Sequence, residues 1–258
     1  FERWGFDGEF VEEQNLNPQM YNSFLDGTKV AVEMCAVANA TGLTPDVPGM
    51  HLPDAAIPEI PEKLRPSEDG GILESTGVVD IVSSRRPDGT EIDHNIEFGV
   101  FVVTTTPNEC VRQYLDQLSG SGLYTASAGE YQLFYRPYHL PGVETSISIA
   151  NAAIRNEPTG TARSHETEVV GGAKRTLTPG DQLDGGGGYT TYGYLVDADR
   201  AAEAGCPLRT TGWRSGDFDR RQRRHRHVRR RFDRRGFIPV HVAVDSRRPV
   251  RVQLGVVG

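Results

Sequence analysis

The charge of the sequence changes sign near Cys206, and this change limits what the chain can fold into. Residues 1–206 hold 31 Asp and Glu against 13 Lys and Arg, a balance of −18. Residues 207–258 hold 15 Arg against 4 Asp, a balance of +11. Because one folded body rarely changes composition so abruptly, we expect an acidic folded part followed by a tail of different origin.

Three explanations of the basic tail stay open. The dense arginine run at residues 220–235 could neutralise phosphates as a nucleic-acid-binding arm, or be a solvated and disordered run. We favour a frameshift, because a one-nucleotide shift in a back-translation of residues 227–235 yields an acidic peptide resembling the preceding chain. On this hypothesis residues 207–258 are disordered and do not pack, and nucleic acid is not the expected partner.

The composition also excludes several classes of protein. No run approaches the roughly 20 apolar residues that a membrane helix needs, and Phe1 opens no export leader. The three cysteines are widely spaced and offer neither a disulfide framework nor zinc-ligand spacing. We therefore expect a soluble, cytoplasmic protein with no membrane partner. The scarcity of lysine in the acidic part favours a halophilic source.

The first third of the chain predicts one helix and one long loop. Residues 1–20 show no clear period and are expected to be the remnant of a preceding domain. Residues 23–40 predict a helix, because apolar residues recur every three or four positions and Gly42 supplies a left-handed stop. Six prolines within residues 44–71 predict a long surface loop or lid.

The middle of the chain predicts alternating strands and helices. Strands are expected at residues 78–82 and 98–105, joined as a hairpin around a Pro-Asp-Gly turn. A helix at 108–118, a strand at 131–138 and a second helix at 146–155 follow. This mixture predicts an α+β domain with a mixed sheet covered on one side, over residues 21–160.

A separate unit is expected over residues 165–206. Short apolar stretches separated by tight turns, with no helix until about Ala201, predict a small all-β module. The glycine run 185–188 lacks the Lys-Ser/Thr and helix of a phosphate-binding loop, so we interpret it as a flexible turn.

Few residues stand out as candidates for chemistry. Lys29 is one of only three lysines before residue 206, and Glu33 lies four positions on along the predicted helix, so Lys29 could donate a proton to a carbonyl. The alternative is a surface Lys–Glu pair of negligible energy. Arg136 and His139 close a strand and could bind an anion and move a proton, or be structural. Arg85-Arg86 are a weaker candidate for an anion site, because such a pair is more often simply solvated charge. No metal site is expected at Asp93-His94, because no second His or Cys lies at ligand spacing.

Four strings in the same order resemble one enzyme group. They are NSFLDGTKVAVEMCAVANATG at 22–42, NIEFGVFVVTTTPNE at 95–109, YRPYHLPGVETSISIANAAI at 135–154 and AKRTLTPGDQLDGGGGYTTYG at 173–193. Together they resemble the homoserine-dehydrogenase-like oxidoreductases with a C-terminal SAF domain, a group that includes deoxyxylulose-phosphate-reductoisomerase-like enzymes.

The resemblance implies a function and a set of site residues. Such proteins have an N-terminal Rossmann domain that binds NAD(P), a catalytic α+β domain and a small SAF-type β-clip, of which this chain would hold the second and most of the third. The implied reaction is NAD(P)H-dependent reduction of a carbonyl in a small sugar-like or phosphorylated substrate. Lys29 would be the catalytic lysine, and the substrate contacts would be Arg86, Arg136, His139 and Lys174.

The sequence also departs from that group, and the departures leave an alternative open. The Rossmann domain is absent from this chain, and the SAF-like part is followed after Cys206 by an arginine-rich sequence. The chain could therefore be an inactive fragment. It could also be a free-standing SAF-type module that binds a sugar acid or another anion without redox activity. A homo-oligomer is compatible with both hypotheses.

Overall fold

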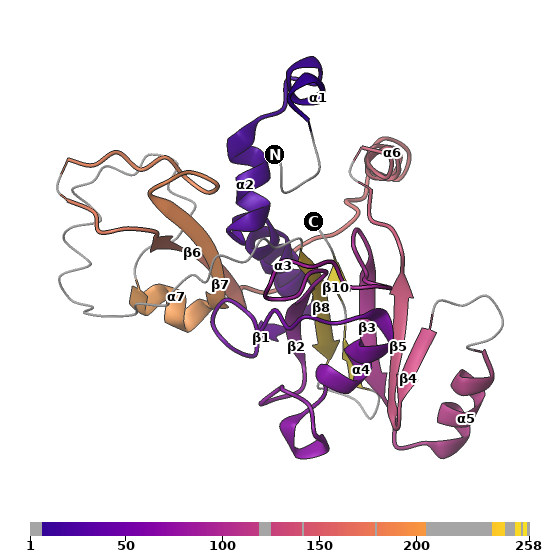
Figure 1. Cartoon of the computed structure of the whole chain (residues 1–258). Coiled ribbons are helices and arrows are strands. Elements are labelled where there is room, and N and C mark those ends of the chain that lie inside the picture. Colours follow the sequence, from indigo (N-terminus) through magenta and orange to yellow (C-terminus); the bar gives the residue numbers. More distant parts are fainter. Residues whose placement is uncertain are drawn as a thin grey trace.

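The computed structural model describes residues 7–118, 125–140, 142–178, 180–204, 239–245, 251–253 and 255–256. Figure 1 shows the course of the chain. The helices are α1 (Gly8–Glu13), α2 (Pro18–Leu25), α3 (Thr28–Thr41), α4 (Ile60–Lys63), α5 (Glu109–Leu118), α6 (Thr145–Ala150) and α7 (Ala198–Ala204), with single turns η2 (Ile57–Glu59), η3 (Ser67–Asp69) and η4 (Asn151–Arg155). The strands are β1 (Thr44–Pro45), β2 (Val78–Ser83), β3 (Val100–Thr105), β4 (Thr125–Ala128), β5 (Tyr131–Arg136), β6 (Thr167–Ala173), β7 (Thr191–Asp197), β8 (Pro239–Asp245), β9 (Arg251–Gln253) and β10 (Gly255–Val256).

A mixed sheet forms the centre of the fold. Its strand order is β1-β2-β8-β9-β3-β5-β4, with β10 paired to β3. β1 and β2 are parallel, and every other neighbouring pair is antiparallel. β2 and β5 consequently run in the same direction and end at one edge, which we call the carboxyl edge; β3 begins there. The predicted α+β class with a mixed sheet is confirmed.

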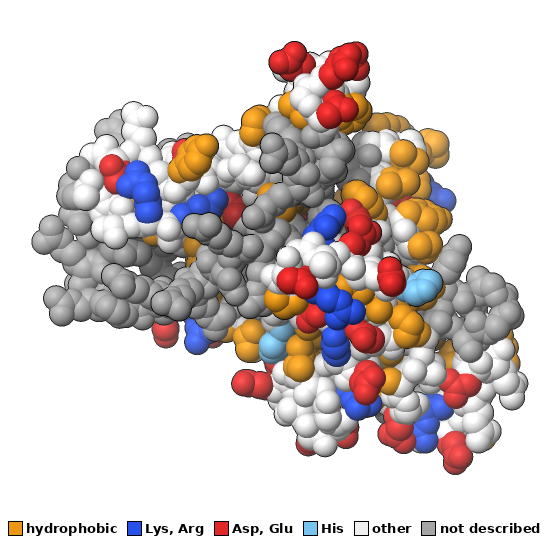
Figure 2. All heavy atoms as spheres, viewed as in Figure 1, with side chains coloured by type: hydrophobic (Ala, Val, Ile, Leu, Met, Phe, Trp, Pro, Cys, Tyr) orange, Lys and Arg blue, Asp and Glu red, His pale blue; other side chains and the backbone are white. Residues whose placement is uncertain are grey.

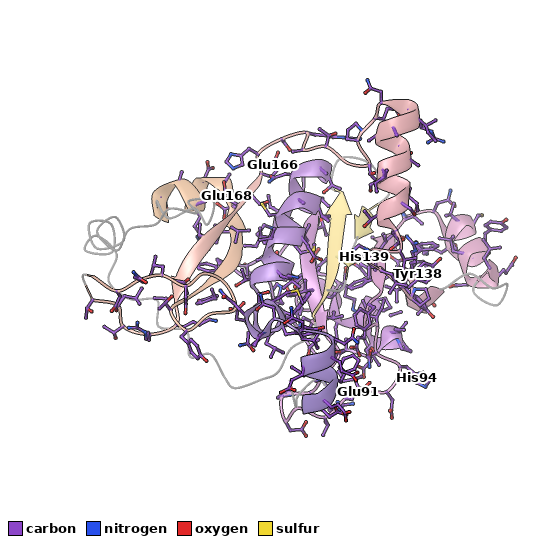
Figure 3. The ribbon with its side chains drawn as sticks, turned by 90° about the horizontal axis from the view of Figure 1, so that it is seen from above. Glu91, His94, Tyr138, His139, Glu166 and Glu168 are labelled. Atoms are coloured by element: carbon purple, nitrogen blue, oxygen red, sulfur yellow. The ribbon has the colours of Figure 1, made fainter. Side chains whose placement is uncertain are left out.

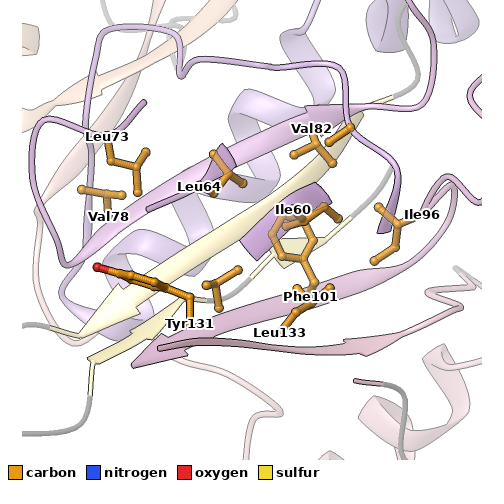
Figure 4. Packing of buried hydrophobic residues seen from close by; sticks show 11 residues of the cluster. Ile60, Leu64, Leu73, Val78, Val82, Ile96, Phe101, Tyr131 and Leu133 are labelled. Carbon is orange, nitrogen blue, oxygen red and sulfur yellow. The ribbon is translucent and has the colours of Figure 1, made fainter. Parts of the chain in front are cut away.

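Two clusters of buried residues cover the two faces of β2. Side chains alternate between the faces of a strand, so Val78 and Val82 point one way and Val79 and Ile81 the other. The first cluster joins Val78 and Val82 to residues of β3, β5 and the 55–73 segment, as Figure 4 shows. The second joins Val79 and Ile81 to α3 and to β6 and β7. All six residues of β2 are buried, so the expectation that only one side of the sheet is covered is wrong here.

The N-terminal part is helical, and short polar motifs set its limits. Residues 8–13 and 18–25 form α1 and α2, although residues 1–20 show no apolar period. The side chains of Asp7 and Asn17 cap these helices, and Pro18 occupies a first-turn position where its missing N–H costs nothing. The predicted helix at 23–40 is confirmed but broken at Asp26-Gly27, where Gly27 has a left-handed φ of 82°.

The proline-rich segment is not a surface loop, and that prediction is wrong. Ala55, Ile60, Leu64 and Leu73 are fully buried and form the centre of the first cluster. Pro58 and Pro61 lie in the first turns of η2 and α4, where proline is tolerated. The prolines therefore shorten the helices without preventing the segment from packing on the sheet.

The two strands predicted around the Pro-Asp-Gly turn both form, but they do not form a hairpin. β8 and β9 lie between β2 and β3 in the sheet. β8 pairs with β2 over five residues, from Val79 opposite Ala243 to Ser83 opposite Pro239. Residues 239–245, 251–253 and 255–256 of the predicted disordered tail thus form strands that pair within this sheet, while the frameshift stays a hypothesis. The alternating segment at 239–245, PVHVAVD, has the β-branched character that suits a strand. The arginine run at 220–235 lies outside the described residues.

The remaining predicted elements form close to their expected limits. Helices α5 and α6 and strand β5 are confirmed, and η4 extends α6 as far as Arg155. Neither α5 nor α6 buries a residue, and α6 with η4 exposes Ile147, Ile149 and Ile154. Figure 2 shows apolar side chains gathered in that region and acidic ones over α1.

Two strands form within the residues for which a small β module is predicted. β6 and β7 form an antiparallel pair with seven residue partners, and α7 follows directly. Residues 174–177, expected as a further short strand, lie outside any strand. Within the described part of the chain, no helix has both the length and the apolar character needed to cross a membrane.

Candidate active site

The start of α3 places Lys29 at the carboxyl edge of the sheet. α3 leads through Leu43 into β1, whose Thr44 lies beside Val78 at the start of β2. The other end of α3 therefore points toward the edge where β2 ends. There the half-buried side chain of Lys29 places its Nζ 4.3 Å from the centre of the Phe24 ring. An ammonium over a ring face is attracted by the ring quadrupole, so this contact gives Lys29 a preferred direction.

Glu33 lies one turn further along α3, on the same face as Lys29. Burial raises the pKa of the Glu33 carboxyl, and the positive charge of Lys29 only partly opposes that rise. Glu33 is thus partly buried, whereas both residues of an ordinary surface Lys–Glu pair are solvated. A carboxyl with a raised pKa can exchange protons closer to neutral pH than a solvated one.

Lys174 reaches the same end of α3 from the end of β6. Its Nζ lies 2.6 Å from Asp26 Oδ2 and 2.6 Å from the carbonyl oxygen of Gly188. Asp26 also accepts a hydrogen bond from the Thr28 backbone at 3.0 Å, which caps α3. Lys29 and Lys174, which are 145 positions apart in the sequence, thus lie at the same helix start.

The glycine run 185–188 packs against α2 and α3. A Cβ at Gly186 would overlap the side chain of Thr28, and one at Gly187 would overlap the backbone oxygen of Gln19. Gln19 Nε2 donates to the carbonyl oxygens of Asp184 and Gly186. The run is a turn, as expected, but it is closely packed. The glycines are needed so that two backbones can approach.

Arg136, Tyr138 and His139 form a second cluster just after β5 around Glu144. Arg136 Nη2 binds Glu144 Oε1, and its guanidinium lies 4.4 Å from the centre of the Tyr138 ring. His139 Nδ1 lies 3.5 Å from Glu144 Oε2. The hydrogen bond from the Leu140 backbone lowers the pKa of Glu144, and the charge of Arg136 adds to this effect. Figure 3 shows Tyr138 and His139 side by side, with Glu166 and Glu168 on the other side of α3.

Arg86 lies apart from both clusters, although at the same edge. It follows the end of β2, and its Nη1 is 3.9 Å from Asp54 Oδ2. Its side chain is 53% exposed. β2 and β5 are four strand positions apart in the sheet, so their ends are separated by about 19 Å at the usual strand spacing. The structure thus brings the five predicted residues to one edge, in three groups.

Sequence reasoning missed a buried cluster around His51. Its Nδ1 lies 2.5 Å from Oδ2 of Asp80, which is fully buried in β2, and its Nε2 lies 3.5 Å from Asp46 Oδ2. Burial opposes the charged imidazole, but the hydrogen bond and charge of Asp80, with the charges of Asp46 and Glu74, outweigh it and raise the pKa of His51. The available signal was Asp80 itself, a carboxylate inside the apolar run 78–82 that burial requires to be paired.

The same region holds unusual backbone. Met50 and Leu52, on either side of His51, both have positive φ, at 66° and 52°. Non-glycine residues adopt this conformation at an energetic cost that the surrounding contacts must offset. Among the residues that the structure describes, no group of three His, Cys, Asp or Glu side chains is arranged to hold a metal ion.

Part of the chain matches a model of a known protein family. A family model described as "Oxidoreductase DRL, catalytic domain" matches residues 6–145. That range contains Lys29, Arg86, Arg136 and His139, whereas Lys174 lies beyond it. No curated protein matches the chain.

Proposed function

Because the family model matches more than half of the chain, the chain belongs to the DRL oxidoreductase family through its catalytic domain, and from that premise we propose its reaction. The proposed reaction is the NAD(P)H-dependent reduction of a carbonyl in a small sugar-like or phosphorylated substrate. This is homoserine-dehydrogenase-like or reductoisomerase-like chemistry. The observation that carries the proposal is that Lys29 and Lys174 lie together at the start of α3, in a chain that is otherwise strongly acidic up to residue 206. Arg86, Arg136 and His139 lie in two further groups at the same edge of the sheet.

Lys29 is the proposed proton donor. As the carbonyl is reduced, negative charge develops on its oxygen, and an ammonium held in one direction stabilises that charge and can transfer a proton. The contact with the Phe24 ring supplies the direction. Glu33, with its raised pKa, is placed to return a proton toward Lys29 after the reaction. General acid catalysis of this kind contributes about 10²- to 10⁴-fold in rate.

The other cations are the proposed anion-binding groups. Lys174 uses two of its three N–H donors on Asp26 and Gly188, which leaves one for a substrate oxygen. Arg136 is held by Glu144 and Tyr138, so its remaining donors have a fixed orientation toward a phosphate or carboxylate. His139, beside the same carboxylate, is the proposed second contact there.

The glycine turn at 185–188 does not fit the pyrophosphate of a dinucleotide. A glycine turn binds pyrophosphate when its backbone N–H groups are open at a helix start. The glycine turn here is filled by Gln19 and Thr28, and the N–H of Gly187 donates to Asp26. We therefore propose that NAD(P)H is bound mainly outside this chain, and no step is derived through it.

A second candidate function follows from the filled glycine turn. A catalytic unit without its own nucleotide site could act as an anion-binding module, with β6 and β7 as the core of an SAF-type unit. Such a module would bind sugar acids or phosphates and carry out no redox step.

The test compares two lysines of the same chain. NADH and NADPH oxidation is followed with a panel of small phosphorylated ketoses and aldehydes, in the chain joined to a nucleotide-binding domain. We expect Lys29→Ala to lower turnover at least 100-fold with little change in Tm. Lys63 lies on α4, and its ammonium binds Glu59 and the Asp54 carbonyl oxygen, so Lys63→Ala should change turnover less than threefold.

Two results would contradict the proposal. Equal turnover in Lys29→Ala would remove Lys29 from the mechanism. Phosphate or sugar-acid binding without any nicotinamide oxidation would favour the binding module.

A further inference from the structure

Asp26 connects the two parts of the chain that meet at the start of α3. Its carboxylate is 9% exposed and has three partners from three segments. Oδ1 accepts the Thr28 N–H at 3.0 Å, and Oδ2 accepts the Gly187 N–H and the Lys174 ammonium, each at 2.6 Å. We propose that Asp26 is a positioning residue of the site, which holds Lys174 and the glycine turn against the helix that carries Lys29. This inference rests on the proposed function.

The contact to Thr28 fixes where α3 begins. Gly27 bends the chain between α2 and α3 and offers no side chain that could cap the helix. The cap is therefore supplied by Asp26, which is three positions before Lys29. A carboxylate at this position also suits the positive end of the helix dipole. If the cap is lost, the first turn of α3 can fray, and the direction of the Lys29 side chain is lost with it.

The contacts of Asp26 Oδ2 fix the part of the site formed by Lys174 and the glycine turn. The Lys174 side chain is 24% exposed, so its pair with Asp26 is largely shielded from water. With one donor on Asp26 and another on the Gly188 carbonyl, the third N–H can point in only one general direction. Thr28 adds a second link between α3 and this part of the chain, because its hydroxyl accepts the Gly193 N–H at 2.9 Å. Asp26 thereby sets how Lys174 meets an anionic substrate.

Simple electrostatics and positioning predict opposite effects of removing the charge. If Asp26 merely competes with a substrate anion for Lys174, then Asp26→Asn should tighten phosphate binding, since a negative charge is removed. If Asp26 orients Lys174, the same variant should weaken phosphate binding. The sign of the change therefore separates the two roles.

The experiment uses the full chain and a matched control. Asp181 also pairs with a cation of the same segment, Arg175, at 2.9 Å, but no described contact joins it to α3. Asp26→Asn, Asp181→Asn, Lys174→Met and the double variant Asp26→Asn/Lys174→Met are compared. Phosphate affinity is measured by calorimetric titration, and hydrogen exchange is measured in peptides that cover residues 26–31 and 184–193.

We expect Asp26→Asn to speed exchange in both peptides about tenfold and to weaken phosphate binding about tenfold, while Asp181→Asn changes neither. In the Lys174→Met background, the effect of Asp26→Asn on phosphate binding should vanish. Unchanged exchange, or tighter phosphate binding, in Asp26→Asn would overturn the inference. A wild-type chain that binds no phosphate would count against the proposed substrate class, and the exchange rates would then decide the role of Asp26.

Discussion

At the scale of single residues, the buried carboxylate of Asp80 creates the strongest requirement for a partner. It lies in the middle of β2 with no exposed side-chain area, and His51 supplies the counter-charge. The backbone N–H of His51 also donates to Asp80 at 2.8 Å. Removing one member of a buried pair costs about 3–5 kcal/mol, because the other is left without compensation.

His51 makes stability depend on pH. Because its pKa is raised in the folded state, the folded chain binds a proton more tightly than the unfolded chain. The stabilisation is complete below the unfolded pKa of about 6.5 and is lost as the pH rises through the folded pKa. We expect Tm to fall over this range in the wild type, and the fall to be absent in His51→Gln.

Thermal unfolding between pH 5.5 and 9 checks this prediction. His165→Gln is the control, because that imidazole is 61% exposed beside Glu168. A wild-type Tm that rises with pH over the same range would contradict the assignment of the effect to His51.

At the scale of elements, the glycine turn shows why a motif can be found while its role is missed. The run 185–188 is plain in the sequence, but its partners Gln19 and Thr28 are more than 150 positions away. Elements with a local signal were predictable, such as α3 with its apolar period and Gly42 stop. Lys29 was proposed from its scarcity and Lys174 from the resemblance of its string, and both roles stay predictions. The apolar run around Asp80 indicated that this carboxylate needs a partner, but no local pattern could identify His51 as that partner or join Asp26 to Lys174 and Gly187.

The turn gives a paired test of packing. Gly187 has a φ of 76°, and a Cβ there would overlap backbone, which cannot move cheaply. Gly185 has nearly the same φ, 79°, but its nearest neighbour would be 3.8 Å away. We expect Gly187→Ala to lower the free energy of unfolding by about 2–4 kcal/mol and Gly185→Ala by about 1 kcal/mol. Urea denaturation measures both, and equal losses would mean that the turn is not packed on α2.

At the scale of the whole molecule, the sheet is completed by the end of the chain. β8 and β9 separate β2 from β3, which the sequence suggested were neighbours. The hairpin was predicted because consecutive strands usually pair, and nothing local to either strand reveals an inserted pair. The burial of both faces of β2 was not predicted either, because the proline-rich segment that covers one face has no regular period.

Deleting the tail therefore tests the architecture. A chain that stops after Cys206 loses β8, β9 and β10, and β2 keeps the two-residue pairing with β1 and the bridge between Ser83 and Asp54. We expect its Tm to fall by roughly 10 °C or more, because several kcal/mol of strand pairing and burial are lost. A chain that ends after Val256 is the control. An unchanged Tm in the shorter chain would restore the hypothesis of a tail that does not pack.

The position of β8 also affects how the protein is made. Its first residue, Pro239, leaves the ribosome 156 residues after Ser83 at the end of β2. At about 5–20 residues per second, the nascent β2 waits on the order of 10–30 s for its neighbour. During that interval apolar strands are open to other chains, so chaperones that shield newly synthesised polypeptides should raise the yield of native protein.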